Sequence, residues 1–133
     1  MKKTLLSVLL ILGSVLCANA EIYKFYTTDF AYKIKDTNGY WSEWSDWEAC
    51  RCLTIINTDR DVINIYSQTP QEFDVYEISG ETSDREGKTI EFKCVDANGL
   101  RCKIRLRKQN DGVLQMYVDY NDIMYVYCLE VRN

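Results

Sequence analysis

The absence of one residue type limits the catalytic chemistry that this sequence could support. The 133-residue chain contains no histidine, so it lacks the imidazole group that serves as a general base, a triad member or a zinc ligand. Acidic pairs such as Asp119 with Asp122 could in principle cleave a glycoside. These pairs fall where turns are expected, and carboxylates at turns ordinarily accept hydrogen bonds from the local backbone. We therefore predict a protein that is not an enzyme and that holds no cofactor.

Three evenly spaced tryptophans form the most distinctive group of side chains. Trp41, Trp44 and Trp47 stand in one short run, with Glu43 and Asp46 between them. A spacing of three does not suit a strand, where neighbouring rings would fall on opposite faces, and it indicates an irregular entry into a strand. Two roles fit this run. The indoles could plug one end of a barrel, or they could bind a sugar or another flat ligand, with Glu43 and Asp46 as polar partners.

The same run resembles two extracellular families. Trp41 to Ser45 resembles the W-S-x-W-S box of class I cytokine receptors, and the longer W-x-x-W-x-x-W-x-x-C run ending at Cys50 resembles the opening of thrombospondin type 1 repeats. Both families layer these tryptophans against cationic side chains, so the resemblance implies cation–π stacking. No function of either family is carried over. The receptor box sits near the end of a domain, and Cys50-Arg51-Cys52 departs from the spacing of the repeat.

The cysteines offer a second kind of chemistry. If Ala97-Asn98-Gly99 is a three-residue loop with Gly99 in the left-handed conformation, Cys94 faces Cys102 across a hairpin, where a disulfide could join them. Cys50 and Cys52 share one face of their strand, so either could meet Cys128. The alternative is that all five are small buried hydrophobic side chains. We predict no metal site, because Cys-x-Cys without histidine does not make a closed zinc site.

The rest of the chain consists of short strands separated by turn signals, which is typical of an all-β sandwich or barrel. Residues 100–107 alternate strictly, so Leu100, Cys102, Ile104 and Leu106 are predicted to face inward. Residues 123–131 are apolar on both faces and are predicted to be covered on both sides. Strands are expected at residues 22–35, 47–57, 62–67, 73–79, 88–95, 100–107, 113–119 and 123–131, with a long polar loop at 80–87.

These strands predict the fold class. Residues 21–133 are expected to form a single antiparallel all-β domain of about eight strands, most simply a small closed or partly open barrel, because closure removes exposed strand edges. A two-sheet β-sandwich is the alternative.

The first twenty residues predict the compartment. Lys2 and Lys3 precede an apolar stretch from Thr4 to Cys17, and Ala18-Asn19-Ala20 has the small-x-small form that signal peptidase cuts. The stretch is too short for a comfortable membrane span. We therefore expect residues 1–20 to be a cleaved secretory signal peptide that leaves no stable membrane anchor. The mature protein is then periplasmic, secreted or at the cell surface, where disulfides are permitted.

Charge narrows the range of partners. Removal of Lys2 and Lys3 leaves 14 basic residues against 20 acidic ones, so the net charge falls from −4 to −6. This excess argues against nucleic acid and against anionic membrane surfaces as partners. The basic residues between positions 101 and 108 are expected to form the solvated face of one strand.

Together these features favour an exported, non-catalytic β-domain. Its aromatic surface is expected to bind a glycan, a small apolar ligand or another protein. The mouth of the barrel is a further candidate binding site for a ligand, by analogy of architecture with lipocalin-like folds. The alternative function is that of a structural or interaction subunit of an envelope or surface assembly.

Overall fold

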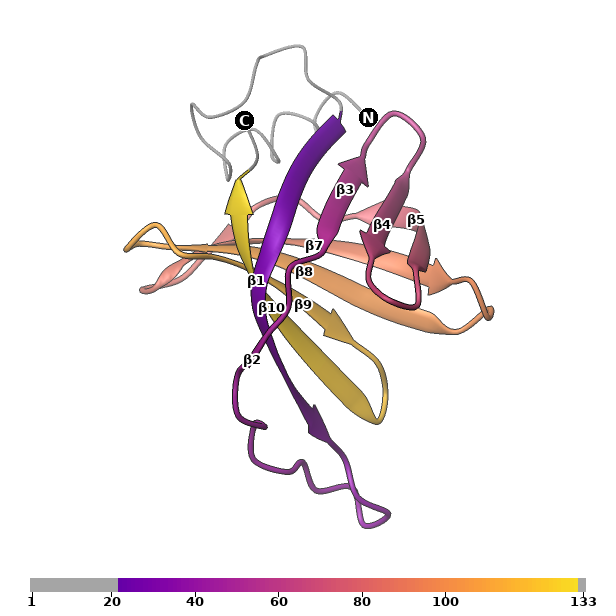
Figure 1. Cartoon of the computed structure of the whole chain (residues 1–133), viewed down its shortest axis with the longest axis vertical. Helices are drawn as coiled ribbons and strands as arrows, with labels where there is room; N and C mark the ends of the chain where they lie inside the picture. The colour runs from indigo at the N-terminus through magenta and orange to yellow at the C-terminus, as the bar shows by residue number, and fades with distance from the viewer. Residues whose placement is uncertain (1–21, 132–133) are drawn as a thin grey trace.

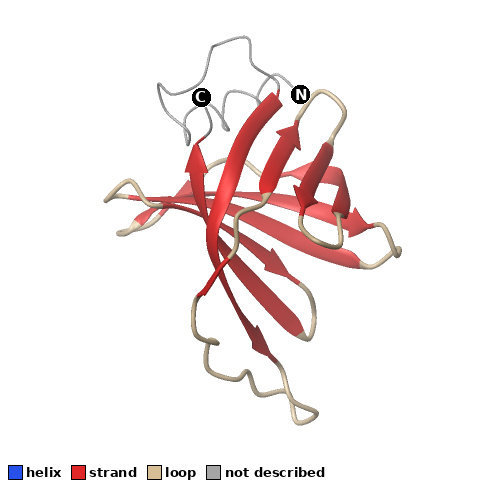
Figure 2. Cartoon of the chain, viewed as in Figure 1, coloured by secondary structure: helices blue, strands red, loops and turns tan. Residues whose placement is uncertain are grey.

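The structure is a computed structural model that describes residues 22–131. These residues form ten strands, all paired antiparallel (Figure 2). Within this range, no helix combines the length and apolar character needed to cross a membrane. The strands are β1(Ile22–Ile34), β2(Glu48–Ala49), β3(Leu53–Asn57), β4(Val62–Tyr66), β5(Gln71–Ile78), β6(Thr82–Ser83), β7(Gly87–Asp96), β8(Arg101–Gln109), β9(Leu114–Asp119) and β10(Ile123–Val131).

The sheet closes on itself as a barrel (Figure 1). Its strands follow the order β10-β9-β8-β7-β5-β4-β3-β1, and β1 pairs with β10 to complete the ring. The two-residue strands β2 and β6 lie outside this ring and pair with β1 and β7. The predicted small barrel is therefore confirmed, and the sandwich alternative is not. An eight-stranded barrel of this kind is just wide enough for side chains to fill its interior.

Alternating side chains fill that interior, because successive residues of a strand point to opposite faces of the sheet. On β7 and β8, Phe92 lies opposite Ile104 and Ile90 lies opposite Leu106, and all four are buried. The strand β10 is covered on both sides only at its middle, where Tyr127 belongs to the core and Val126 is buried on the outer face. The rest of the strand is partly exposed, so the prediction that residues 123–131 are covered on both sides is confirmed only there. The largest fully buried side chains are Tyr23, Phe25, Phe73, Phe92, Ile56, Ile63, Ile65, Ile90, Ile104, Leu106 and Met116.

The hairpin turn between β7 and β8 has the predicted form. Gly99 has a φ of +83°, which is left-handed and favours glycine. The Asp96 carboxylate accepts hydrogen bonds from the amides of Asn98 and Leu100, both at 2.9 Å. Residues 36–40 repeat this Asp-x-Asn-Gly turn, with Asp36 accepting two backbone hydrogen bonds at 2.9 Å.

Three details of the prediction were wrong. Leu100 does not face inward and is 58% exposed, because it belongs to the turn and not to the alternating part of β8. The expected strand at residues 47–57 is split into β2 and β3 by an irregular stretch at 50–52. The expected loop at residues 80–87 contains β6, which pairs with the start of β7.

The long strand β1 extends past its neighbour β3. The pairing of β3 with β1 ends at Tyr26, whereas β10 pairs with β1 as far as Ile34. A register irregularity between Thr27 and Asp29 marks the change. Figure 1 shows the lower half of β1 running below the barrel, with the loop that follows it folding back alongside. One edge of β1 is therefore left for that loop to cover.

Three basic side chains on the outer face of β8, Lys103, Arg105 and Arg107, form ion pairs with acidic side chains of neighbouring segments. Arg107 donates to both carboxylate oxygens of Asp84 at 3.0 Å. Asp84 also accepts hydrogen bonds from the amides of Glu86 at 2.8 Å and Gly87 at 3.0 Å. These contacts, with the Arg107 hydrogen bond as the largest cause, lower the pKa of Asp84 from 3.8 to about 2.

We expect the carboxyl of Asp84 to titrate near pH 2 in an NMR pH titration. Because its folded pKa lies below its unfolded pKa, its stabilising contribution is complete above pH 3.8 and is lost as the pH falls towards 2. Arg107→Gln should move the pKa of Asp84 back towards the ordinary value. The neighbouring exposed Arg85 is the matched control, and an equal shift in Arg85→Gln would contradict the assignment.

Close approach of two strands makes Gly87 sensitive to substitution. A Cβ at this position would lie 2.8 Å from the Cα of Gln109 and closer still to the carbonyl oxygen of Lys108. We expect Gly87→Ala to lower the free energy of unfolding by about 1–3 kcal/mol in urea denaturation, because backbone atoms must shift. Gly80→Ala is the control, since a Cβ there meets nothing within 4 Å. Equal losses in the two variants would refute the clash.

Candidate binding site

Residues 41–47, here called the tryptophan segment, run back along the open edge of β1. The amide of Ser42 donates to the carbonyl of Ile34 at 2.8 Å, and the amide of Ile34 donates to the Ser42 hydroxyl at 3.0 Å. Ser45 makes the same two hydrogen bonds with Tyr32, at 2.7 and 2.9 Å. The serine hydroxyls thus replace backbone carbonyls as acceptors for β1.

The repeat of three residues explains the tryptophan spacing. Ser42 and Ser45 are three positions apart and make equivalent contacts with β1. Trp41 and Trp44 precede them by one position each and are therefore presented in equivalent ways. The segment lies outside any regular strand, in agreement with the predicted irregular entry into the next strand.

Lysine side chains of β1 pack against the indoles. The ammonium nitrogen of Lys33 lies 4.7 Å from the ring centroid of Trp44 and 5.6 Å from that of Trp41. The ammonium nitrogen of Lys35 lies 5.0 Å from the ring centroid of Trp41. All three distances are within the range of a cation–π interaction. The stacking implied by the family resemblance is therefore present in this segment.

The stack continues across the outside of the barrel. The ring centroid of Trp44 lies 6.3 Å from that of Tyr117 on β9, and the guanidinium carbon of Arg105 on β8 lies 4.2 Å from the Tyr117 centroid. Arg105 is fixed in turn by two hydrogen bonds to Asp119, at 2.6 and 3.1 Å. We call this series the aromatic–cation ladder: Lys35, Trp41, Lys33, Trp44, Tyr117 and Arg105.

The ladder covers a small apolar patch on the outer face of the sheet. Ala31 on β1 and Val126 on β10 lie opposite each other, and both are buried without belonging to the barrel core. Lys33 lies two residues from Ala31, and Tyr117 pairs with Val126. Trp44, which contacts both Lys33 and Tyr117, therefore spans this patch.

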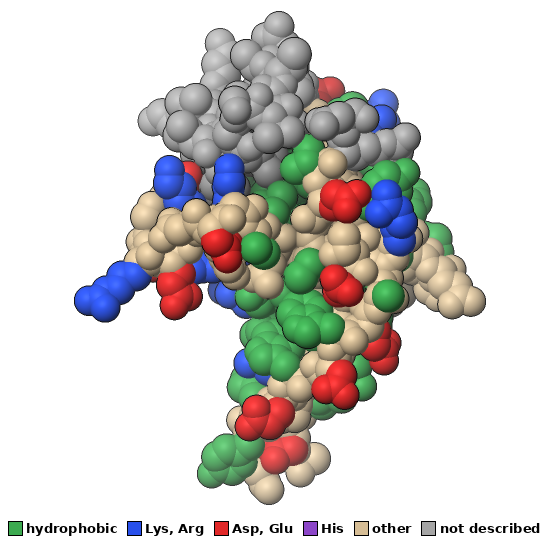
Figure 3. All heavy atoms as spheres, turned by 60° about the vertical axis from the view of Figure 1, so that its left-hand side comes forward, with side chains coloured by type: hydrophobic (Ala, Val, Ile, Leu, Met, Phe, Trp, Pro, Cys, Tyr) green, Lys and Arg blue, Asp and Glu red, His purple; other side chains and the backbone are tan. Residues whose placement is uncertain are grey.

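The indoles keep part of their surface exposed. Trp41, Trp44 and Trp47 are 36%, 39% and 52% exposed, and none belongs to the core, so they do not plug the barrel. Trp47 has no ring or cation partner among residues 22–131. Glu43 and Asp46 are exposed beside the indoles. Figure 3 shows hydrophobic side chains gathered in the lower half of one face, with acidic side chains around them.

Sequence reasoning found the tryptophans but not the other members of the ladder. The resemblance implied cations without naming them. The sequence did contain a pattern that could have identified the lysines. Lys33 and Lys35 alternate with apolar residues at the end of the strand that precedes the tryptophans, so both side chains lie on one face of that strand. Tyr117 and Arg105 carried no such signal, because their distance from the segment depends on barrel closure.

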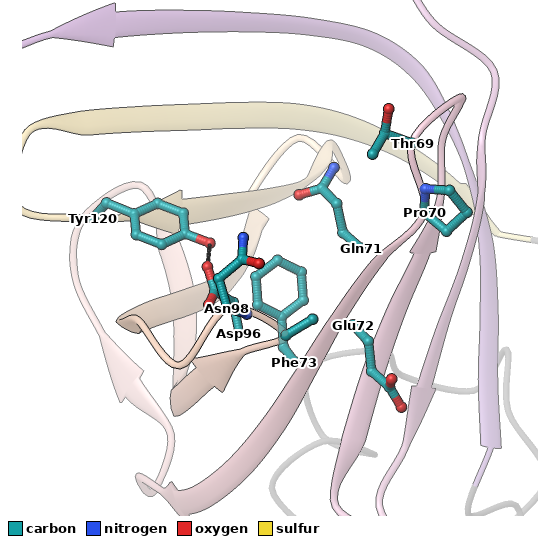
Figure 4. Close-up of a pocket in the computed structure, with 9 residues that line it drawn as sticks. Thr69, Pro70, Gln71, Glu72, Phe73, Asp96, Asn98 and Tyr120 are labelled. Carbon is teal, nitrogen blue, oxygen red and sulfur yellow. Dashed lines mark hydrogen bonds between the residues drawn. The ribbon is translucent and has the colours of Figure 1, made fainter.

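The mouth of the barrel holds a pocket of about 190 Å³ (Figure 4). Gln71, Asn98 and Tyr120 lie around the ring of Phe73, whereas Glu72 points away. The Tyr120 hydroxyl donates to Asp96 at 2.8 Å, and burial together with this bond raises the pKa of Tyr120. The pocket lining consists of Thr69, Pro70, Gln71, Glu72, Phe73, Asp96, Ala97, Asn98 and Tyr120. Its volume is below the range of about 300–1,000 Å³ that is typical of drug-sized ligands.

The five cysteines at positions 50–128 are free thiols. Cys94 and Cys102 face each other as predicted, and their hydrogen bond, together with burial, raises the pKa of Cys94. The disulfide between them is not formed in this structure and stays a prediction. Cys50 and Cys52 contact each other, with sulfurs 3.1 Å apart. The expected contact of one of them with Cys128 is absent, because Cys128 contacts Gln115 instead.

Comparisons with protein-family models, with curated proteins and with solved structures find no significant match to this chain. Among residues 22–131, no group of three or more acidic or cysteine side chains is gathered as a metal ion would require.

Substitution of Lys33 tests the ladder. We expect Lys33→Met to lower the free energy of unfolding by about 1 kcal/mol, because it keeps the apolar stem but removes the charge between two indoles. Tryptophan fluorescence should change as well, because all three tryptophans lie in the segment. Lys24→Met is the matched control, because Lys24 is an exposed lysine on the same strand. A larger effect at Lys24 than at Lys33 would contradict the ladder.

Proposed function

We propose that this chain is an exported, non-catalytic domain that binds carbohydrate through Trp41, Trp44 and Trp47, with Glu43 and Asp46 as hydrogen-bond acceptors. The observation that carries the proposal is that one segment, held to β1 by hydrogen bonds, carries three partly exposed indoles. Export is inferred from residues 1–20, which lie outside the described range.

The chemistry of the exposed surface favours a sugar over the other candidate ligands. A sugar ring has a C–H face that can lie against an indole and hydroxyl groups at its edge that can donate to carboxylates. Glu43 and Asp46 supply such carboxylates, and neither side-chain carboxylate has a hydrogen-bond partner or ion pair within residues 22–131, since the Ser42 and Ser45 hydroxyls donate to the backbone carbonyls of these residues. An anionic ligand would be repelled by the same carboxylates. A small apolar ligand would need an enclosed apolar pocket, and the pocket at the barrel mouth is small and carries the polar side chains of Gln71, Asp96 and Asn98 in its lining.

Preorganisation supports the same conclusion. The serine hydrogen bonds and the lysine contacts hold the segment before any ligand arrives. Rigid aromatic side chains lose little conformational entropy on binding, so more of the contact energy appears as affinity.

Trp47→Ala is the sharpest test. Trp47 is the most exposed of the three indoles and has no ring partner in the described part of the chain, so its removal should leave the barrel intact. We expect a panel of neutral oligosaccharides, read by tryptophan fluorescence, to contain a ligand that binds Trp47→Ala at least about tenfold more weakly than wild type. This corresponds to a loss of about 1.4 kcal/mol.

Tyr76→Ala is the matched control, because Tyr76 is an exposed aromatic residue on β5, away from the ladder. Unchanged affinity in Trp47→Ala, or a panel without any ligand, would overturn the proposal. Binding of a lipophilic probe that competes at the indoles would instead support a small apolar ligand.

A second candidate function follows from the other face of β1. Tyr32 and Ile34 are 37% and 49% exposed there, and they pair with Tyr125 and Ile123 of β10. This apolar strip favours the alternative of an interaction subunit in a surface assembly. Size-exclusion chromatography at several protein concentrations tests this alternative. Self-association of the wild type that is lost in Ile34→Ser would support a subunit role, and a wild type that stays monomeric would contradict it.

A further inference from the structure

A pair of thiols lies in the irregular stretch at residues 50–52, between β2 and β3. The sulfur atoms of Cys50 and Cys52 are 3.1 Å apart. In a regular strand, residues two positions apart are separated by about 6.6 Å along the strand axis. The irregular stretch between β2 and β3 therefore brings these two side chains much closer than strand geometry would.

The bulge in β1 fixes the backbone of both cysteines. The amide of Cys50 donates to the carbonyl of Thr28 at 3.0 Å. The amide of Cys52 donates to the Thr27 hydroxyl at 2.9 Å, and the amide of Thr27 donates to the carbonyl of Cys52 at 2.9 Å. The Thr27 hydroxyl in turn donates to the carbonyl of Cys50. Thr27 is itself fully buried, so this arrangement is anchored in the barrel.

The two thiols differ in access. Cys50 is partly exposed and packs against the core, whereas Cys52 is only 8% exposed and belongs to the core. Burial, together with the neighbouring Cys50 sulfur, raises the pKa of Cys52. The Cys50 thiol is thus the one that can react with an external group, and the buried Cys52 thiol is in contact with it.

We propose that Cys50 and Cys52 form a thiol–disulfide exchange site whose substrate is an external disulfide, R–S–S–R. The thiolate of Cys50 attacks one sulfur of the substrate, which breaks the S–S bond, forms a mixed disulfide with Cys50 and releases one R–S⁻ that takes up a proton. The Cys52 thiol then gives up its proton and attacks the Cys50 sulfur, which forms the Cys50–Cys52 disulfide and releases the second R–SH. The pair loses two electrons and the substrate gains them, and the reverse reaction is equally balanced.

The other cysteines do not offer this arrangement. Cys94 and Cys102 are both buried, so neither sulfur faces an incoming disulfide. Cys128 is half-buried, but its contact is with Gln115 and not with a second thiol. Cys128 therefore provides an internal control for simple thiol accessibility. The site is independent of carbohydrate binding by the tryptophan segment.

The test uses protein purified after expression of the full chain, fully reduced and then treated with glutathione disulfide. Free thiols are alkylated, and the protein is denatured and digested with trypsin. Trypsin cuts after Arg51, so a Cys50–Cys52 disulfide leaves peptides 36–51 and 52–60 joined. We expect this joined species in wild type, with no glutathionyl group retained on Cys50.

Variants separate the two steps. Cys52→Ala should accumulate a glutathionyl group on Cys50, because the resolving thiol is absent, while Cys50→Ala should form neither product. Cys128→Ser should behave as wild type. Complete alkylation of both Cys50 and Cys52 in treated wild type would overturn the proposal, and so would a stable glutathionyl group on wild-type Cys50. Circular dichroism establishes that each variant is folded, and Cys52→Ser replaces Cys52→Ala if the alanine variant is not.

Discussion

The edge of β1 that β3 leaves uncovered is the constraint on which the rest of this structure depends. Backbone amides and carbonyls that leave water must find partners, and β3 supplies them only as far as Tyr26. Beyond that point, β2 pairs with Asp29 and Phe30. Tyr32 then forms hydrogen bonds with Ser45, and Ile34 with Ser42. The position of the tryptophans follows from this requirement, because the residues that cover the edge also carry the indoles.

Two other features follow from the same edge. The outer face of β1 carries the lysines that contact the indoles, so covering the edge also assembles the aromatic–cation ladder. The bulge at Thr27, where β1 changes partners, holds the backbone of Cys50 and Cys52. The barrel interior is filled with side chains, and so the surfaces available for binding lie outside it and at its mouth.

The fold could be predicted from the sequence wherever a local rule was sufficient. Period-two alternation identified the strands, and the Asp-x-Asn-Gly signal identified the turn that sets Cys94 opposite Cys102. Leu100 was assigned to the wrong environment because alternation does not reveal where a strand stops and its turn begins. The split between β2 and β3 was missed for a related reason, since nothing in residues 50–52 marks the irregularity that Thr27 imposes from a distance.

The candidate site was only partly predictable. Trp41, Trp44 and Trp47 were recognisable by spacing, and Glu43 and Asp46 by adjacency. Their supports lie elsewhere along the chain. Tyr117 and Arg105 approach Trp44 only because β8, β9 and β10 are consecutive in the sheet and β10 closes onto β1. Such long-range contacts depend on the register of several strand pairs at once, which no local pattern encodes.

The two Asp-x-Asn-Gly turns have a bearing on the chemical lifetime of the chain. Asparagine followed by glycine is prone to deamidation, in which the glycine nitrogen attacks the asparagine side chain. At both Gly39 and Gly99 that nitrogen donates a hydrogen bond of 3.0 Å to the carbonyl of the turn's first residue, Asp36 or Asp96. Attack requires this bond to open. We therefore expect Asn38 and Asn98 to deamidate mainly when their turns are open.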